Sequence, residues 1–148
     1  MTVYRMHRAV RLAGDYTGAM LAGGRWNPID TPMLYTAQHL SLACLEVLVH
    51  LDKHQLPRDY VWSRVDLLHR PEFLTIASLQ DVSSCQSAGN TWLRTQKQLA
   101  IQAPSVIIPE EFNILLNPTH ADYQALLWSD PQPFHFDSRL FLTEPQTL

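Results

Sequence analysis

The segment from Leu42 to Leu51 constrains the fold of this chain most, because it is an apolar run that contains one carboxylate, Glu46. The neighbours of Glu46 are alanine, cysteine, leucine and valine, so a helix formed here is apolar on nearly all sides and is expected to be buried. A glutamate is almost never fully buried without a partner, and an uncompensated buried carboxylate is very costly. Glu46 is therefore predicted to face a polar cleft, a metal ion or a cation, the last including a purely structural ion pair with an arginine.

Two features upstream of this run are expected to join it in one pocket. The pair Gly23-Gly24 is followed by Arg25, and a double glycine indicates either a tight backbone turn or a place where a ligand comes close. A short strand from Met33 to Thr36 carries Tyr35. The rest of the chain is predicted to close this pocket.

The chain is expected to form one domain over residues 1–148. It is 46% hydrophobic, which is enough to build a core at this length. It contains no apolar run long enough to span a membrane and no signal-peptide core near its N-terminus. Cys44 and Cys85 indicate neither a disulfide framework nor a zinc cluster. We therefore expect a cytoplasmic protein without a membrane partner.

The charge pattern argues against direct nucleic-acid binding. The formal net charge is −3, and nucleic-acid binders carry a clustered basic face. Here the arginines are scattered, apart from Arg5, Arg8 and Arg11, and lysine occurs only at Lys53 and Lys97. A small phosphorylated ligand remains compatible with this pattern, because the planar guanidinium fork suits phosphate oxygens.

The element pattern favours an α+β fold with a mainly antiparallel sheet, because short strands are interrupted by a few helices without a regular βαβ rhythm. Strands are expected at Thr2–Val10 as an edge, Met33–Thr36, Tyr60–Leu67, Leu74–Leu79, Pro104–Pro109, Phe112–Leu116 and from Phe134 to about Leu142. Helices are expected at 41–50 with Ser41 as the N-cap, at Thr91–Leu99 and at Ala121–Trp128. Turns or loops are expected at Gly14–Ala22 and Ser83–Gly89.

Several separated motifs resemble the RES-domain toxin family, in the order that the family has them. They are Tyr4-Arg5, Gly23-Gly24-Arg25-Trp26-Asn27-Pro28, Leu34-Tyr35-Thr36-Ala37, Ala43 with Leu45-Glu46-Val47-Leu48-Val49-His50, Pro104-Ser105-Val106-Ile107-Ile108-Pro109, Asn113, and Leu116-Asn117-Pro118-Thr119-His120. The family is named for an arginine, a glutamate and a serine, which match Arg25, Glu46 and Ser105. One departure is Asp30, which stands where a glycine is common in the family.

The resemblance implies a fold like that of ADP-ribosyltransferases and a toxin of a bacterial toxin–antitoxin pair. Such toxins consume NAD as a substrate, with no separate cofactor, by cleaving the nicotinamide–ribose bond. Some do this by hydrolysis or phosphorolysis, and at least some transfer ADP-ribose to a protein. The implied partner is an antitoxin with a helix-turn-helix DNA-binding part, and a homodimer is also expected.

The resemblance also implies roles for individual residues. Glu46 is expected to hydrogen-bond a ribose hydroxyl and to stabilise the oxocarbenium-like state, a role that suits a carboxylate near the ribose. Arg25, with Arg5, is expected to hold pyrophosphate oxygens. Ser105 is expected to bond the ribose or the nicotinamide amide. These assignments make Glu46, Arg25 and Ser105 the predicted catalytic residues.

Two more residues are predicted to contact NAD. Tyr35 is expected to stack on or wall in the nicotinamide, because an aromatic face tolerates a cationic ring. Asn117 is a further candidate that orders the pocket wall. The NAD-binding set predicted from the sequence is Arg5, Arg25, Tyr35, Ser105 and Asn117.

Alternatives remain at this point. Glu46, His50 and His54 share one face of a helix, and histidines four residues apart do bind zinc, but no HExxH motif occurs and no metal site is predicted. The protein acceptor of a transferase is not distinguishable from water or phosphate by sequence. A partner-binding module without catalysis is the remaining alternative, and the presence of all the polar motif residues argues against it.

Overall fold

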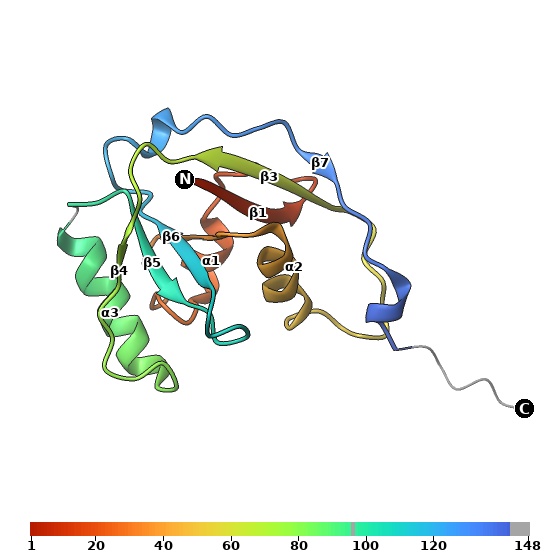
Figure 1. The fold of residues 1–148 in the computed structure, drawn as a ribbon, viewed down its shortest axis with the longest axis horizontal. Coiled ribbons are helices and arrows are strands. Elements are labelled where there is room, and N and C mark those ends of the chain that lie inside the picture. The colour runs from red at the N-terminus through yellow and green to blue at the C-terminus, as the bar shows by residue number, and fades with distance from the viewer. Residues whose placement is uncertain (96, 143–148) are drawn as a thin grey trace, which may run out of the picture.

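The computed structural model describes residues 1–95 and 97–142, and its centre is a seven-stranded sheet (Figure 1). The strands are β1 (Thr2–Arg8), β2 (Leu34–Ala37), β3 (Tyr60–Asp66), β4 (Glu72–Phe73), β5 (Ala100–Pro104), β6 (Phe112–Leu116) and β7 (Gln132–Pro133). Their order across the sheet is β4-β5-β6-β2-β1-β3-β7. Every neighbouring pair is antiparallel except β4 and β5, so the predicted α+β fold with a mainly antiparallel sheet is confirmed.

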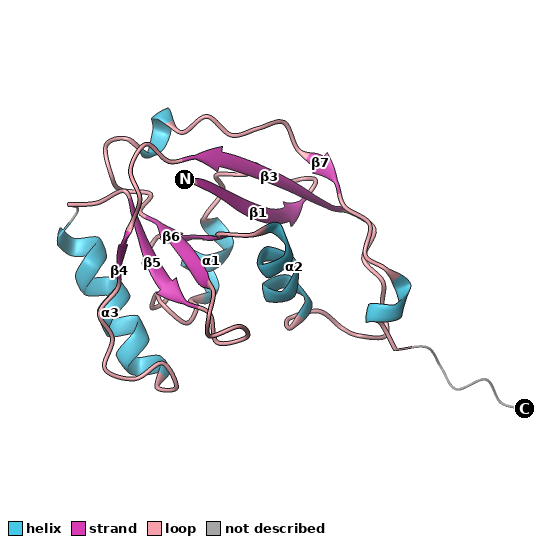
Figure 2. Cartoon of the chain, viewed as in Figure 1, coloured by secondary structure: helices cyan, strands magenta, loops and turns pink. Residues whose placement is uncertain are grey.

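Three α-helices accompany the sheet (Figure 2). They are α1 (Thr17–Ala22), α2 (Leu40–Leu48) and α3 (Val82–Thr95), and two 3-10 turns lie at Tyr123–Ala125 and Ser138–Leu140. Within residues 1–95 and 97–142, no helix has the length and apolar character that crossing a bilayer requires.

The two faces of the sheet are covered differently. Alternation along β1 places Val3 on one face and Met6 on the other. Val3 belongs to a core cluster covered by irregular segments, which contribute Tyr16, Tyr123 and Trp128. We call this the loop-covered face. We call the other, on which α2 and α3 pack, the helix-covered face.

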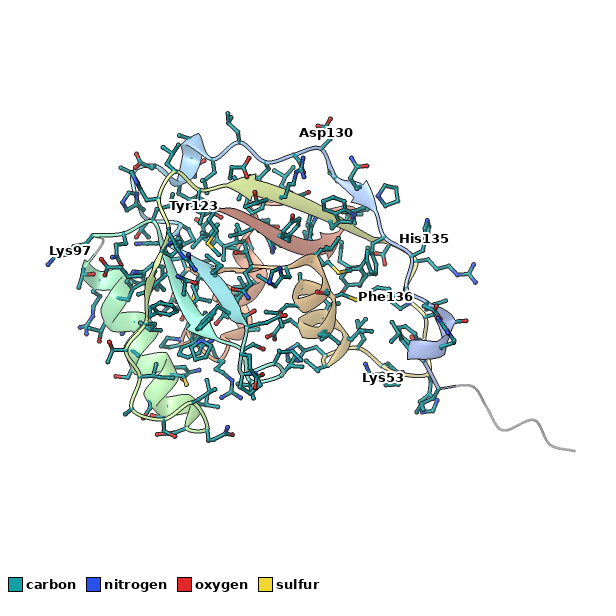
Figure 3. The ribbon with its side chains drawn as sticks, in the orientation of Figure 1. Lys53, Lys97, Tyr123, Asp130, His135 and Phe136 are labelled. Carbon is teal, nitrogen blue, oxygen red and sulfur yellow. The ribbon has the colours of Figure 1, made fainter. Side chains whose placement is uncertain are left out.

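The helix-covered face carries two separate apolar clusters. Cys85, Trp92 and Leu93 of α3 pack in one cluster with side chains of β5 and β6. Leu42, Ala43 and Leu48 of α2 pack in the other with Met6 and Ala37. Phe136, which follows β7, also lies in the α2 cluster (Figure 3). The strip of sheet between α2 and α3 is where the polar side chains described below are found.

Some predicted strands are correct and others are not. β2, β3 and β6 lie where strands are predicted, and β6 matches residue for residue. β1 is not an edge strand, because β2 and β3 pair with it on its two sides. The expected strand at Pro104–Pro109 is wrong, since β5 ends at Pro104. The expected strand at Leu74–Leu79 is also wrong. The strand expected from Phe134 to about Leu142 is not formed either, because β7 ends at Pro133.

The helix predictions need larger corrections. Ser83–Gly89 is not a loop but the first half of α3, which Asp81 caps by accepting a hydrogen bond from Ser83 N at 3.1 Å. α3 ends at Thr95, and Leu99 leads into β5 instead. Thr17–Ala22 is helical, with Asp15 Oδ1 accepting from Thr17 N at 2.9 Å. α2 begins at Leu40, so Ser41 is not its cap, and the helix expected at Ala121–Trp128 is only a 3-10 turn.

His7 is a buried polar residue of β1 on the loop-covered face, with 4% of its surface exposed. Its Nδ1 lies 3.1 Å from the Arg8 carbonyl oxygen, and its Nε2 lies 3.0 Å from Ser63 Oγ. A carbonyl oxygen only accepts hydrogen bonds, so Nδ1 carries the hydrogen and Nε2 accepts from the Ser63 hydroxyl. Burial lowers the pKa of His7, and the neighbouring charge of Arg5 lowers it further.

This burial makes stability depend on pH. The unfolded chain protonates His7 near pH 6.5, whereas the folded chain does so only at lower pH. The contribution of His7 to stability is therefore complete above pH 6.5 and is lost as the pH falls toward the folded pKa. Between pH 7.5 and 5.5 we expect the free energy of unfolding to fall more in the wild type than in His7→Gln. Urea unfolding at the two pH values measures this difference, and equal losses would contradict it.

Candidate functional site

Glu46 points from α2 toward the sheet. It follows Leu42 by four residues and Ala43 by three, and both of these side chains are buried against the helix-covered face. Residues at these spacings share one side of a helix. The apolar run therefore aims its one carboxylate at the sheet rather than at solvent, as its surroundings in the sequence indicate.

Two neutral side chains bind the Glu46 carboxylate. Ser105 Oγ donates to Glu46 Oε1 at 2.9 Å, and Asn113 Nδ2 donates to the same oxygen at 2.7 Å. Among the residues that the structure describes, Glu46 forms no ion pair with an arginine and Oε2 has no hydrogen-bond partner. One carboxylate oxygen is thus fixed in place while the other is left for a further donor.

Ser105 is held in a tight turn between β5 and β6. It is fully buried, and its Oγ also accepts hydrogen bonds from Ile107 N and Ile108 N, each at 3.1 Å. The hydroxyl therefore accepts hydrogen bonds from the backbone of the turn and donates its own hydrogen to Glu46. Ser105 is fully buried and positions the carboxylate, and the direct ligand contact predicted from the sequence stays a prediction.

Asn113 belongs to the site but is absent from the predicted set. It lies in β6 between Ala37 of β2 and Ala103 of β5 in the same cross-strand row. Ala37 belongs to the α2 cluster and Ala103 to the α3 cluster, so Asn113 marks the junction of the two. The signal in the sequence was a single amide in the apolar strand Phe112–Leu116.

Tyr35 lies on the same face and beside Asn113. Tyr35 pairs with Leu115, two residues after Asn113, and such diagonal neighbours are about 7–8 Å apart. Its hydroxyl donates to Asn27 Oδ1 at 2.6 Å and accepts from Trp26 N at 3.0 Å. Burial raises the pKa of Tyr35 well above its usual range, so the hydroxyl stays protonated. The ring is half-buried and walls the site next to Glu46.

Arg25 lies in the loop after α1. Trp26, which follows it, is buried in the α3 cluster and bonded through its N–H to the Tyr35 hydroxyl. The Arg25 guanidinium donates from Nη1 to the Leu79 carbonyl oxygen at 2.9 Å. Its positive charge lowers the pKa of Tyr35, against the larger effect of burial. The structure thus brings Arg25 close to Tyr35, whose strand position lies on the same face of the sheet as Asn113.

The structure does not bring Arg5 to this cluster. Arg5 shares the loop-covered face with Val3, whereas Glu46 stands over the opposite face. Its guanidinium donates to the carbonyl oxygens of Ala13 and Asp15, the latter at 2.7 Å. Burial lowers the pKa of Arg5 to about 10, which still leaves it charged at neutral pH. The alternation of side chains along β1 turns Arg5 away from the carboxylate, and its contact with NAD stays a prediction.

Asn117 is also distant from Glu46. It follows β6 at the end opposite to Asn113, roughly 13 Å along the strand at about 3.3 Å per residue. Its Oδ1 accepts from Thr119 N at 2.9 Å and from Thr119 Oγ1 at 2.7 Å, and the residue is fully buried. Asn117 therefore shapes the turn after β6, and its role at the pocket wall stays a prediction.

The helical alignment behind the metal alternative is not formed. α2 ends at Leu48, so His50 and His54 lie beyond the helix and do not continue the face of Glu46. Across residues 1–95 and 97–142, no group of three or more histidine, cysteine, aspartate or glutamate side chains is arranged to hold a metal ion.

Cavity size does not identify the site. A cavity of about 860 Å³ lies at the other end of the sheet, where Leu67, Arg70, Leu99 and His120 line it. A shallower one of about 510 Å³ lies between β4 and α3. Glu46 lines neither of them. We place the functional site at Glu46 because converging polar side chains carry chemistry and an empty volume alone does not.

Comparison with known proteins places this geometry in a family. The RES domain model matches residues 2–137. The chain belongs to the RES domain family. It is 34% identical over 151 residues to the "Toxin Res" of Photorhabdus laumondii, covering 95% of this chain and 97% of that protein. It is 31% identical over 147 residues to the "Prs ADP-ribosylating toxin" of a Sphingobium species, covering 92% of this chain and 90% of that protein.

A solved structure shares the fold of this RES domain. It is the crystal structure of the M. tuberculosis MbcT-MbcA toxin-antitoxin complex, with a TM-score of 0.68 and 18% sequence identity, covering 90% of this chain and 84% of that one. The likeness supports the RES fold described above, with its mixed sheet and short helices.

One unusual backbone conformation lies in the loop that carries Arg25. Asp30 has a φ of 66°. This left-handed region favours glycine, and aspartate is among the few other residues that enter it readily. Asp30 N donates to the Met20 carbonyl oxygen at 2.8 Å. The loop therefore keeps a turn that glycine suits although this chain has a side chain there.

Proposed function

We propose that this RES domain is the toxin of a toxin–antitoxin pair and that it cleaves the nicotinamide–ribose bond of NAD. The observation that carries the proposal is the Glu46 carboxylate, which is held by Ser105 and Asn113 through Oε1 and is unpartnered at Oε2 among the described residues. The curated relatives named as toxins support the same reading.

The chemistry of this bond suits a fixed carboxylate. When the C–N bond breaks, its electron pair goes to the nicotinamide nitrogen, which becomes neutral, and positive charge develops on the ribose. A preorganised anion beside the ribose stabilises that charge where it forms. Glu46 Oε2 is the oxygen placed to accept a hydrogen bond from a ribose hydroxyl, while Oε1 remains bound to its two donors.

The remaining residues bind and orient the dinucleotide. Arg25 supplies the cation for the pyrophosphate, because only one of its five N–H donors is used by Leu79 and charge-assisted bonds to phosphate are strong. Tyr35 presents a half-buried ring beside Glu46 for the nicotinamide. Ser105 acts through Glu46.

Nicotinamide release from NAD tests the proposal. The purified protein is incubated with NAD in buffers with and without phosphate, and free nicotinamide is quantified by chromatography. Release that requires phosphate identifies a phosphorylase, and release without phosphate identifies a glycohydrolase. If the protein does not bind NAD at all, the proposal is overturned.

A second candidate is transfer of ADP-ribose to a protein through the same site. It is favoured by the relative named as an ADP-ribosylating toxin, which is 31% identical. The two functions differ only in what attacks the ribose carbon after nicotinamide leaves. NAD labelled in its adenylate phosphate distinguishes them, since only a transferase moves the label onto protein in a cell extract.

The proposal includes a protein partner. We propose an antitoxin with a helix-turn-helix part, encoded beside the toxin. In support, the fold of this chain is similar to that of a chain in a solved toxin–antitoxin complex. Co-expression with the neighbouring gene product is expected to yield a complex that no longer releases nicotinamide. The homodimer expected from the sequence stays a prediction, and light scattering of the purified chain measures it.

Ser105→Ala is expected to reduce activity through Glu46. The change removes one of two donors to Oε1 and the acceptor of two turn N–H groups. A hydrogen bond to a charged group contributes about 1.5–3 kcal/mol, so we expect a roughly tenfold loss of kcat or more. Steady-state kinetics measures it, with the exposed Ser83→Ala as control. Unchanged kcat in Ser105→Ala would contradict the positioning role.

A further inference from the structure

Gln86 of α3 bonds to the backbone on both sides of the Arg25-Trp26 dipeptide. Its Nε2 donates to the Gly24 carbonyl oxygen at 2.9 Å and, more weakly, to the Asn27 carbonyl oxygen at 3.4 Å. One side-chain amide therefore closes the turn that presents Arg25. None of the motifs identified in the sequence includes Gln86.

The backbone of α3 touches the same turn one helical turn later. A Cβ added at Gly89 would lie 1.8 Å from the Trp26 carbonyl oxygen, so the helix and the loop are in direct backbone contact. Gln86 and Gly89 are three residues apart and share a face of the helix. The guanidinium of Arg25 is in turn bonded to Leu79, which lies just before α3. Residues 79–89 thus hold both the backbone and the side chain of Arg25.

We propose that Gln86 is a positioning residue that fixes Arg25 for binding the pyrophosphate of NAD; this inference rests on the proposed function. The turn needs such support because it contains Gly23, whose φ is 71°, and Gly24, and glycines allow many alternative backbone conformations. A binding group held in place before the ligand arrives loses less entropy on binding. Gln86 supplies that order through the two carbonyl groups and does not itself contact the ligand.

Gln86→Met tests the role, because methionine keeps the length and helix propensity of the side chain and removes its donor. ADP-ribose is the probe, since it carries the pyrophosphate without the scissile bond. We expect its Kd, measured by titration calorimetry, to rise about tenfold. KM for NAD is expected to rise similarly with kcat within twofold, because the bonds that fix Glu46 do not involve α3. Ser87→Ala, on the exposed side of the same helix, is the matched control and should bind as the wild type does.

A double-mutant cycle identifies the route of the effect. If Gln86 acts through Arg25, the variant with both Gln86→Met and Arg25→Ala binds ADP-ribose as weakly as Arg25→Ala alone. Additive losses would overturn the inference, as would equal Kd values for Gln86→Met and the wild type. A parallel fall of kcat and thermal stability in Gln86→Met would also overturn it, because it would mark a structural role. Failure of the wild type itself to bind both NAD and ADP-ribose would instead overturn the proposed function.

Discussion

Glu46→Gln is expected to lower the rate of nicotinamide release by about 10²–10³-fold, the range found when one preorganised electrostatic group is removed from an active site. Glutamine keeps the size of the side chain, and its amide oxygen still accepts hydrogen bonds from Ser105 and Asn113. The negative charge beside the ribose is lost. The change thus separates the charge of Glu46 from its shape.

Nicotinamide release under single-turnover conditions measures this effect directly, because the chemical step is then observed without product release. Glu110→Gln is the matched control, since Glu110 is an exposed carboxylate in the connection between β5 and β6. Its rate should equal that of the wild type. A fully active Glu46→Gln enzyme with unchanged NAD affinity would remove Glu46 from the mechanism.

Gly89→Ala is expected to lower the free energy of unfolding by about 3 kcal/mol, at the upper end of the usual cost of overpacking. The added methyl group would lie 1.8 Å from the Trp26 carbonyl oxygen. That atom belongs to backbone, which cannot rotate away as a side chain does. α3 must therefore move off the loop, and the Arg25 turn loses its contact with the helix.

Gly18→Ala is the matched control for this prediction. Gly18 is also helical, in α1, but nothing lies within 4 Å of an added Cβ. Alanine is favoured over glycine in a helix by up to about 1 kcal/mol, so this variant should be as stable as the wild type or more so. Chemical denaturation of the three proteins gives the comparison. Equal stability of Gly89→Ala and the wild type would mean that the helix and the loop are not in rigid contact.

The sequence predicts correctly those strands whose residue types strongly favour a strand. β6 and β3 are rich in strand-forming residues, and their bounds follow from them. The first half of α3 was missed because serines, a glycine and an asparagine give residues 82–90 the composition of a loop. The cap at Asp81 and the spacing from Cys85 to Trp92 and Leu93 indicate a helix, yet burial of those three side chains against the sheet decides it.

The candidate site was predictable only where a polar residue stands in an otherwise apolar segment. Glu46 stands out because it is the charge in an apolar helix. Asn113 makes the same kind of exception in β6, but an amide is a weaker signal than a charge. The motif could not show that Arg5 faces away from Glu46, because the face of a strand depends on register with its neighbours and the motif gives only a position along the chain. Ser105 was found by resemblance, while its burial emerged only from the turn around it.

Both edge strands of the sheet are very short, which limits how any protein can bind this RES domain. β4 and β7 have two residues each, and Pro133 in β7 has no N–H to offer. Strand addition needs a row of free backbone groups, and neither edge supplies one. A protein partner must therefore bind surface side chains rather than add a strand to the sheet. Because backbone pairing is common to all sequences and side-chain surfaces are not, this architecture favours partners that discriminate between related RES domains.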